Sequence, residues 1–484
     1  MAKAKLTYLG RMIALQPREL GAQFEDVCQV TTHHTEAASL ENGWKQKEVH
    51  QDHTLWWTAP NPDGTESWCA MSGYGPRIEF VLREQGHEVE VVDLMPSGLP
   101  APRFDNLGAV EWRGSQKAIL AACLANRIGL VVCPTGFGKS FLVQCLCKLY
   151  PGCRIIATVP STDVARDLHA RISSNIDNVG FVGDGSNNPQ LITVAVTHSL
   201  HRCNSDAALV ICDEAHAVLT EDLMAKFAMF GRAKFLAFTA SPEGRGDGGD
   251  GFMEALFGPA LCRVPYSEAV ESGNVAPIKV WMYNQTIGPD VSKHKRRDIK
   301  NRYGIWTNGA RHQTIARAVY EARQVLGADA QILIMVQTIE HAMRLQQILT
   351  DFVVVTGEAE DLREVELRAC GGMLEWQKIC TKKERAAYKD AFSSGQLRCA
   401  IANMIWSKGV DFKGLQCLIR GDGLASPIQS TQVPGRLSRL GHDGQKEYGL
   451  LIDINDIFSS DLRWRSKTRA DSYTQHGWSI EYRQ

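Results

Sequence analysis

The stretch CPTGFGKS at residues 133–140 decides the fold, because it joins two segments of different periodicity. Residues 128–132 before it form a short apolar run, and residues 141–149 after it carry apolar side chains at helical spacing. Gly136 and Gly138 let backbone N–H groups turn toward a phosphate, and the positive end of the following helix favours the same anion. The stretch therefore predicts a buried strand, a phosphate-binding loop and a helix.

Two side chains at the end of this loop suit a magnesium nucleotide. Lys139 is expected to reach the β and γ phosphates, and the Ser140 hydroxyl to bind Mg²⁺. The full phosphate-loop pattern has a glycine where this chain has Cys133. The string alone therefore leaves a plain structural turn open as an alternative.

An acidic motif further along the chain strengthens the nucleotide interpretation. The string ALVICDEAH at residues 208–216 places Asp213 and Glu214 at the carboxyl end of a buried strand, the edge at which parallel sheets bind ligands. We expect Asp213 to orient Mg²⁺ and Glu214 to position and deprotonate the attacking water. A strand that simply ends in acidic residues would explain Asp213 alone. It does not explain lysine, serine, aspartate and glutamate in this order, so we predict ATP hydrolysis.

The composition narrows the class of protein. A chain of 484 residues, 44% of them apolar, is long enough for two to four domains. Its 14 scattered cysteines favour a reducing compartment, so we expect a cytoplasmic protein, and no stretch of about 18 apolar residues suggests a membrane span. The net charge of −1 argues against a surface that binds nucleic acid all over, so any such binding is expected in a cleft.

The pattern of apolar and polar segments along the chain predicts α/β architecture with two doubly wound parallel-sheet domains in tandem, preceded by a small α+β domain. Short apolar runs alternate with turns and polar segments after about residue 103, and again after about residue 310. In chain order the expected segments are an N-terminal accessory domain at 1–100, a first α/β domain at 103–265, a linker at 266–310, a second α/β domain at 311–460 and a tail at 461–484.

Taken together, four strings resemble successive motifs of superfamily 2 helicases and translocases: WRGSQ at 112–116, PTGFGKS at 134–140, DEAH at 213–216 and TAS at 239–241. That family commonly has a non-glycine residue where Cys133 stands. The resemblance implies two RecA-like domains, ATP and Mg²⁺ as cofactors, and coupling of the nucleotide to a nucleic-acid path through His216, Thr239 and Ser241. It also implies an ATP-binding set: Arg113, Gln116, Pro134, Thr135, Gly136, Phe137, Gly138, Lys139, Ser140, Gly409, Asp411 and Gln432.

The second α/β domain carries QVPGRLSR at residues 432–439, which resembles the QxxGRxxR motif of the same family. Arg436 and Arg439 are three residues apart and would share one face of a helix. We expect Arg439 to act as an arginine finger and Arg436 to contact the γ phosphate. A solvated basic helix is the alternative, but residues 403–415 upstream resemble the family's preceding motif.

Nucleic-acid contacts are expected just past several strands, where hydroxyl and backbone N–H groups suit sugar and phosphate. Turn or helix-capping roles are about equally common for such residues. The basic run at 293–302 and the tail with Trp464 were each compatible with nucleic acid or with a structural role. The expected contacts are Pro160, Ser161, Thr162, Thr197, His198, Gln337 and Thr338.

The N-terminal segment resembles that of UvsW-type recombination helicases of tailed phages and, more distantly, the XPB-like group, through WKQKEV at 44–49 and the helix and strand at 75–91. This resemblance implies an ATP-dependent DNA helicase or translocase that remodels branched DNA, and action on RNA–DNA hybrids. An RNA helicase and the motor subunit of a restriction or defence complex are the alternatives. A DNA-binding scaffold without activity would not need Lys139, Glu214 and Arg439 together.

Overall fold

The computed structural model describes residues 3–40, 43–240, 248–357, 361–403, 406, 412, 414–425, 434–441 and 446–484, without the side chains of 34–48 and 361–363. The chain divides into two compact units. Unit 1 comprises Met1–Pro134 and Gly138–Pro265, and unit 2 comprises Thr135–Phe137 and Tyr266–Gln484. No helix among the described residues is long and apolar enough to cross a bilayer.

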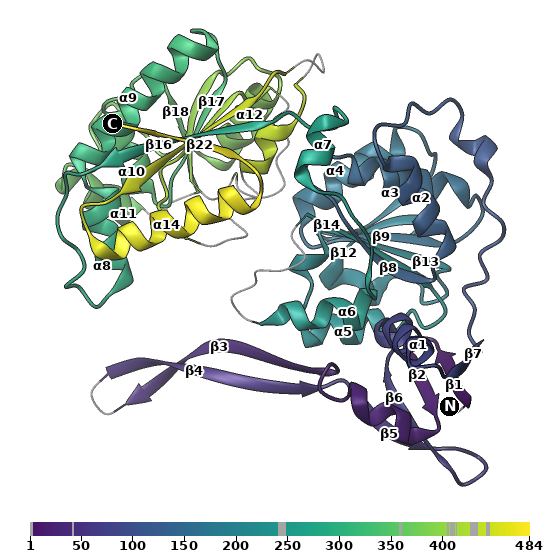
Figure 1. Ribbon diagram of the computed structural model, residues 1–484. Helices are drawn as coiled ribbons and strands as arrows, with labels where there is room; N and C mark the ends of the chain where they lie inside the picture. The colour runs from purple at the N-terminus through teal and green to yellow at the C-terminus, as the bar shows by residue number, and fades with distance from the viewer. Residues whose placement is uncertain are drawn as a thin grey trace. The chain divides into compact units, whose positions relative to one another are not determined.

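Unit 1 begins with a five-stranded sheet of order β5-β6-β2-β1-β7 (Figure 1). Helix α1 (Gly75–Glu84) packs against it through Ile78 and Leu82, which are buried with Trp68 in one core. The strands and helix at residues 56–93 confirm the prediction of an α+β unit, whereas β1 and β2 were not predicted. The strands are β1 (Lys3–Leu9), β2 (Met12–Gln16), β5 (Trp56–Pro60), β6 (Glu66–Met71) and β7 (Glu88–Asp93).

A long hairpin, β3 (Gln29–Leu40) and β4 (Gly43–Thr54), forms a separate two-stranded ribbon (Figure 1). Its base packs against the first α/β domain, where the His53 ring lies 5.0 Å from the Phe252 ring. The hairpin was not predicted, because its strands carry too few apolar residues to show an alternating pattern.

The first α/β domain is an eight-stranded sheet of order β11-β10-β12-β9-β13-β14-β8-β15, parallel except at β11. Short strands that are buried on both faces match the apolar runs in the sequence. The strands are β8 (Ile128–Val132), β9 (Ile155–Val159), β10 (Val179–Gly183), β11 (Ser186–Asn188), β12 (Ile192–Val196), β13 (Leu209–Asp213), β14 (Lys234–Thr239) and β15 (Ala260–Arg263).

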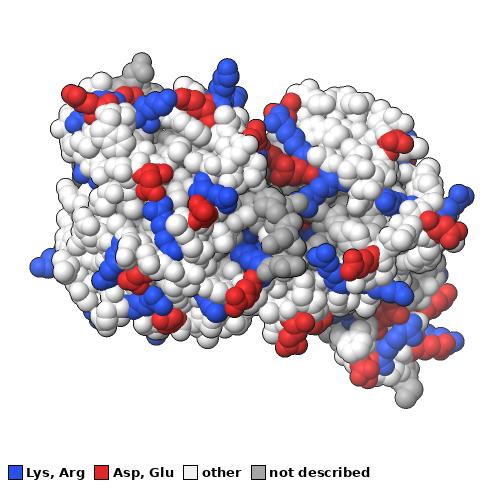
Figure 2. Space-filling model, turned by 90° about the horizontal axis from the view of Figure 1, so that it is seen from above, with Lys and Arg blue, Asp and Glu red and all other residues white. Residues whose placement is uncertain are grey.

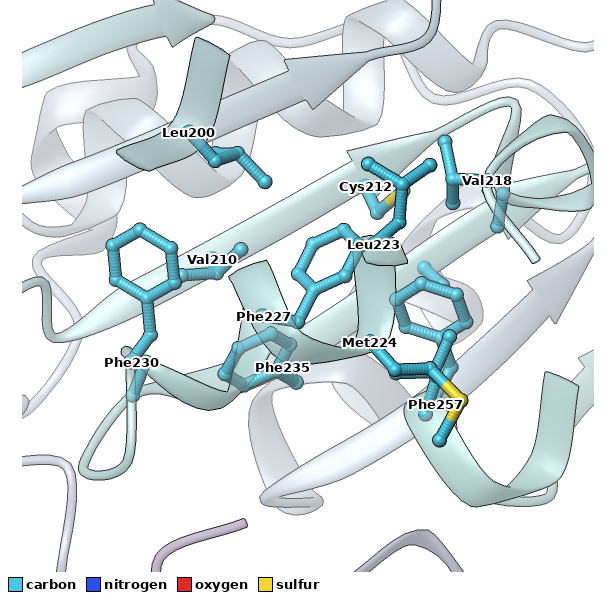
Figure 3. Packing of buried hydrophobic residues seen from close by; sticks show 14 of the residues in the cluster. Leu200, Val210, Cys212, Val218, Leu223, Met224, Phe227, Phe230, Phe235 and Phe257 are labelled. Atoms are coloured by element: carbon cyan, nitrogen blue, oxygen red, sulfur yellow. The ribbon is translucent and has the colours of Figure 1, made fainter. Parts of the chain in front are cut away.

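Helices cover both faces of this sheet (Figure 1). On one face, side chains of β13, β14, α5 and α6 form a continuous apolar core that includes Phe227, Phe230 and Phe257 (Figure 3). This core holds the strands rigidly beneath their carboxyl ends. The helices are α2 (Gln116–Ala125), α3 (Lys139–Leu149), α4 (Thr162–Ser173), α5 (Glu221–Ala228) and α6 (Phe252–Phe257).

Unit 2 contains a seven-stranded sheet of order β18-β19-β17-β20-β21-β16-β22, in which every described pairing is parallel. This confirms the predicted α/β class for the second domain. The strands are β16 (Ile278–Gln285), β17 (Ile332–Met335), β18 (Val353–Val355), β19 (Cys399–Ala402), β20 (Cys417–Arg420), β21 (Gly449–Asp456) and β22 (Ser479–Arg483).

Two of the predicted segment boundaries need correction. Residues 266–310 are not a linker, because β16 lies between β21 and β22 inside the second sheet. Residues 461–484 are not an appended tail, because they form most of α14 (Ser460–Gln475) and the edge strand β22. The remaining helices of unit 2 are α7 (Tyr266–Glu271), α8 (Arg297–Asn301), the π-helix η7 (Arg302–Trp306), α9 (Gly309–Leu326), α10 (Ile339–Gln346), α11 (Asp361–Ala369) and α12 (Lys382–Ser393).

Candidate functional site

Three neighbouring strands of the first α/β domain bring the predicted catalytic segments to one edge of the sheet. Strand β14 lies between β13 and β8, with Asp213 paired to Phe238 and Thr239 paired to Val132. All three strands are parallel, so their carboxyl ends meet at this edge. The acidic motif, Thr239 and the glycine-rich loop therefore converge, as the motif order predicted.

The glycine-rich loop has the backbone that its composition predicted. Gly136 and Gly138 adopt φ values of +90° and +106°, which side chains disfavour, and α3 begins directly afterwards at Lys139. A Cβ atom on Gly138 would lie 2.7 Å from Nε2 of Gln116. Glycine is thus required at 138 both by conformation and by the close approach of Gln116.

Cys133 occupies a position that does not need glycine. Its backbone N–H donates to the Thr239 carbonyl oxygen at 3.0 Å, which continues the β8–β14 pairing by one residue. Its side chain is buried, and its φ is not in the left-handed region. The departure from the full phosphate-loop pattern therefore leaves the backbone geometry of the loop intact.

The acidic motif concentrates negative charge in a buried place. Burial and, after it, the Glu214 carboxylate raise the pKa of the Asp213 carboxyl to about 7, against the opposing effect of Lys139. Asp213 accepts a hydrogen bond from the Glu214 backbone N–H at 2.9 Å. A cation placed here would favour the ionised carboxylate, which is the electrostatic requirement for a divalent metal site.

Glu214 and His216 connect this carboxylate region to β14. Glu214 has a left-handed backbone with φ +55°, an uncommon conformation for a non-glycine residue. His216 Nδ1 lies 3.0 Å from Thr239 Oγ1 and 3.5 Å from Glu214 Oε2. The two described members of the predicted coupling set are thus in contact, while Ser241 lies outside the described residues.

The segment before α2 contributes Arg113 and Gln116. The Arg113 backbone N–H donates to Gln116 Oε1 at 3.2 Å, and Gln116 is almost fully buried beside the loop. Trp112, which the sequence interpretation passed over, packs edge-on against Phe141 of α3 with ring centroids 5.8 Å apart. The sequence could have indicated Trp112 through its position next to Arg113. Its ring holds this segment against α3, the helix that follows the loop.

In unit 2, the predicted arginines lie on and just after the 3₁₀ helix η9 (Pro434–Ser438). Arg436 is buried and donates through Nη1 to the Trp406 carbonyl oxygen, while Arg439 is half-buried. The expected helix is therefore a single tight turn. Gly409, Asp411 and Gln432 lie outside the described residues.

The residues predicted to contact nucleic acid differ in their burial and in the hydrogen bonds that they make within the fold. Thr197 is fully buried, and its hydroxyl is 3.0 Å from that of Thr158, so its side chain is part of the core. Gln337 Oε1 accepts hydrogen bonds from Asn301 Nδ2 at 3.3 Å and Trp306 Nε1 at 3.1 Å. The hydroxyl of Thr338 caps α10, which is the helix-capping role given above as the alternative to a nucleic-acid contact. His198 is exposed, and Pro160, Ser161 and Thr162 are half-buried.

Comparisons with known proteins agree with this geometry. The AAA domain model matches residues 124–240, which span the loop and the acidic motif. The DNA 3'-5' translocase XPB2 of Sulfurisphaera tokodaii is 25% identical over 403 residues, covering 79% of this chain and 89% of that protein.

Two solved structures share the fold. A fragment assigned as an HsdR subunit of a type I restriction enzyme from Vibrio vulnificus aligns with a TM-score of 0.54 at 14% identity, over 94% of this chain and 92% of that one. Dbp5 of S. cerevisiae, bound to RNA and ADP BeF3, aligns with a TM-score of 0.53 at 14% identity, over 79% and 96%.

These findings support a superfamily 2 helicase. The chain has the parallel-sheet α/β domains that these solved structures share, and the AAA match together with the similarity to a translocase supports a nucleic-acid-dependent ATPase.

Proposed function

We propose that this helicase is an ATP-dependent DNA translocase that remodels branched DNA by fork reversal, branch migration or unwinding of D-loops and R-loops. The observation that carries the ATPase part is the convergence of Lys139, Asp213, Glu214 and Thr239 at one sheet edge beside a glycine loop. DNA as the substrate is supported by the similarity to a DNA translocase over 79% of the chain.

Each residue of the edge has a defined task in this proposal. The N–H groups of residues 135–138 and Lys139 hold the phosphates, and Ser140 and Asp213 hold Mg²⁺, which supplies charge neutralisation on the nucleotide when bound. Glu214 orients a water molecule and accepts its proton. Arg113 and Gln116 flank the base.

Unit 2 supplies the remaining groups in this proposal. Arg439 is the arginine finger in this proposal, and Arg436, which donates to the Trp406 carbonyl oxygen, contacts the γ phosphate. Gly409, Asp411 and Gln432 complete the nucleotide contacts. His216 and Thr239 transmit the state of the γ phosphate through the hydrogen bond between them.

The test compares ATPase rates and strand separation on a DNA fork, a four-way junction, an R-loop, single-stranded DNA and single-stranded RNA. We expect branched DNA to stimulate ATP hydrolysis most and Lys139→Ala to abolish turnover on every substrate. Stimulation by RNA alone would favour the RNA helicase alternative. Translocation without strand separation would favour a motor subunit, and equal rates with and without nucleic acid would refute the proposal.

A further inference from the structure

The two segments that the nucleotide site leaves unused meet on one surface of unit 2. They are the basic run at 293–303 and the first turns of α14 at 460–467 (Figure 1). Lys300 Nζ lies 2.9 Å from Asp461 Oδ1, and Arg465 Nη1 donates to Asn301 Oδ1 at 2.6 Å. These contacts between residues about 160 positions apart fix the two segments as one patch, which we name the α8–α14 surface.

The contacts that join the segments involve buried or half-buried side chains, whereas the exposed cations lie outside these contacts. Two of the exposed cations have carboxylate partners of their own, Arg296 with Asp298 at 2.6 Å and Arg302 with Glu340 at 3.6 Å. Asp461 is held between Lys300 and Arg465, and Arg465 is buried. The exposed lysines and arginines of the first segment are Lys293, Lys295, Arg296, Arg297 and Arg302.

The second segment adds two further exposed cations, Arg463 and Lys467. Asp298, which pairs with Arg296, is the one exposed carboxylate in these two segments, both of which the structure describes throughout. Figure 2 shows basic and acidic side chains interspersed over the face that it draws. The excess of cations on the α8–α14 surface is therefore a local feature in a chain whose net charge is −1.

Large aromatic side chains stand among these cations. Trp464 is 64% exposed and Tyr303 is 50% exposed, although the neighbouring Leu462 and Gly304 are buried. The His294 and Tyr303 rings are stacked at 5.9 Å with an interplanar angle of 25°. A basic face with a purely solvating role needs no exposed tryptophan, whereas aromatic rings among lysines and arginines are the means by which proteins bind single strands.

The surface adjoins the end of β17, where a nucleic-acid contact was predicted. Asn301 of α8 and Trp306 of η7 both donate to the side-chain oxygen of Gln337. A single strand of nucleic acid that passes Gln337 and Thr338 would therefore continue onto the α8–α14 surface.

We propose that the α8–α14 surface is an accessory binding site for single-stranded DNA, in which Trp464 and Tyr303 stack on bases while the surrounding lysines and arginines contact phosphates. The inference rests on the proposed function, because it assigns a further contact to the same substrate. It concerns residues outside the nucleotide site, so the two can fail separately.

The experiment measures binding of a fluorescein-labelled oligothymidylate to the full-length helicase by fluorescence anisotropy, with DNA-stimulated ATPase in parallel. We expect Tyr303→Ala combined with Trp464→Ala to weaken binding by about tenfold or more, since loss of one stacked base typically costs that much. The DNA concentration for half-maximal ATPase stimulation rises by the same factor, and the rate without DNA is unchanged. The matched control is Trp376→Ala, which removes a tryptophan that is 54% exposed elsewhere in unit 2.

A second pair of variants tests the phosphate contacts. Arg463→Ala with Lys467→Ala is expected to lower the steepness of log Kd against log salt by about 1.4, the value for two phosphate contacts on a single strand. Lys382→Ala with Lys383→Ala makes the same change in net charge at exposed positions on α12 and is expected to leave that steepness unchanged.

The outcomes separate the two ideas. Wild-type stimulation by DNA, with no difference between the Tyr303/Trp464 variant and the Trp376 control, would overturn the α8–α14 surface and leave the proposed function standing. An equal loss on duplex DNA would overturn base stacking, and weakening confined to oligouridylate would overturn the assignment to DNA. A wild-type protein that binds no oligonucleotide would overturn both proposals.

Discussion

Two buried aspartates near the carboxyl edges of the two large sheets, Asp213 and Asp453, have pKa values shifted in opposite directions. At the edge of the first sheet, burial and Glu214 raise the pKa of Asp213 to about 7. At the edge of the second, Asp453 is equally buried, but Arg469 and Arg420 outweigh the effect of burial and lower its pKa. The Arg469 guanidinium contacts Asp453 through two bonds of 2.7 and 3.0 Å, and Tyr473 donates a third of 2.7 Å.

The difference shows that position in the fold does not by itself make a functional site. Both sheets end in carboxylates where parallel sheets bind ligands. In unit 2 the carboxylates of Asp453, Asp456 and Asp422 are each paired with an arginine, namely Arg469, Arg311 and Arg420, although burial still raises the pKa of Asp456. In unit 1 the negative charge exceeds what Lys139 offsets, and a cation from outside is the fitting complement.

The largest expected effect is a loss of catalysis at the edge of the first sheet, in unit 1. Glu214→Gln removes the proton acceptor without changing size, and its side chain is only partly buried. We expect the DNA-stimulated kcat to fall by about two to four orders of magnitude with the stability unchanged, because general base catalysis contributes that much. Steady-state ATPase assays and thermal unfolding measure both quantities. Glu268→Gln, at an exposed position, is the control, and a Glu214→Gln protein with near-normal kcat would contradict the assignment.

The matching change in unit 2 is expected to act on stability. Asp453→Asn leaves Arg469 buried without its carboxylate, which should lower the free energy of unfolding by about 3–5 kcal/mol. Urea unfolding followed by circular dichroism measures this loss. Asp471→Asn, at an exposed position on the same helix as Arg469, should cost little. If Asp453→Asn were instead stable but inactive, the second edge would also be a ligand site and the comparison would fail.

Two stacked, buried histidines of unit 2, His312 and His341, are expected to make its stability depend on pH. Burial, Arg311 and Arg344 lower the pKa of His312 to about 4, and burial and His312 lower that of His341 well below its usual range. Protons then bind the unfolded chain more tightly, so the stability contributed by neutral His312 is full above about pH 6.5 and is lost as pH falls toward about 4.

The measurement is urea unfolding of wild-type protein and His312→Gln at about pH 7.5 and about pH 5. The wild-type loss of stability should exceed that of the variant by about 2 kcal/mol, because only the wild type takes up this proton on unfolding. Equal losses in the two proteins would mean that His312 is already charged in the folded state.

The first edge was predictable from the sequence because its signals are local. Asp213 ends one apolar run and the short loop that leads to Lys139 follows another, and parallel strands must bring such ends together. Strand β16 was missed because its partners β21 and β22 are more than 160 residues away and its aromatic residues gave no clear period. The buried arginines of unit 2 were missed because arginine is rarely buried unless paired, and the pairing depends on long-range packing.

The smallest expected effect concerns Cys133, whose presence in place of glycine first put the loop in doubt. Its side chain fills a buried position and its backbone pairs with Thr239 in an ordinary extended conformation, so a glycine there would add no freedom that phosphate binding uses. We expect Cys133→Gly to lower the free energy of unfolding by about 1 kcal/mol through lost packing and greater chain entropy. The ATPase kcat/KM should stay within about twofold of wild type. A large gain in kcat/KM would show that the cysteine restrains the loop, and that charge at the sheet edge is not what limits catalysis.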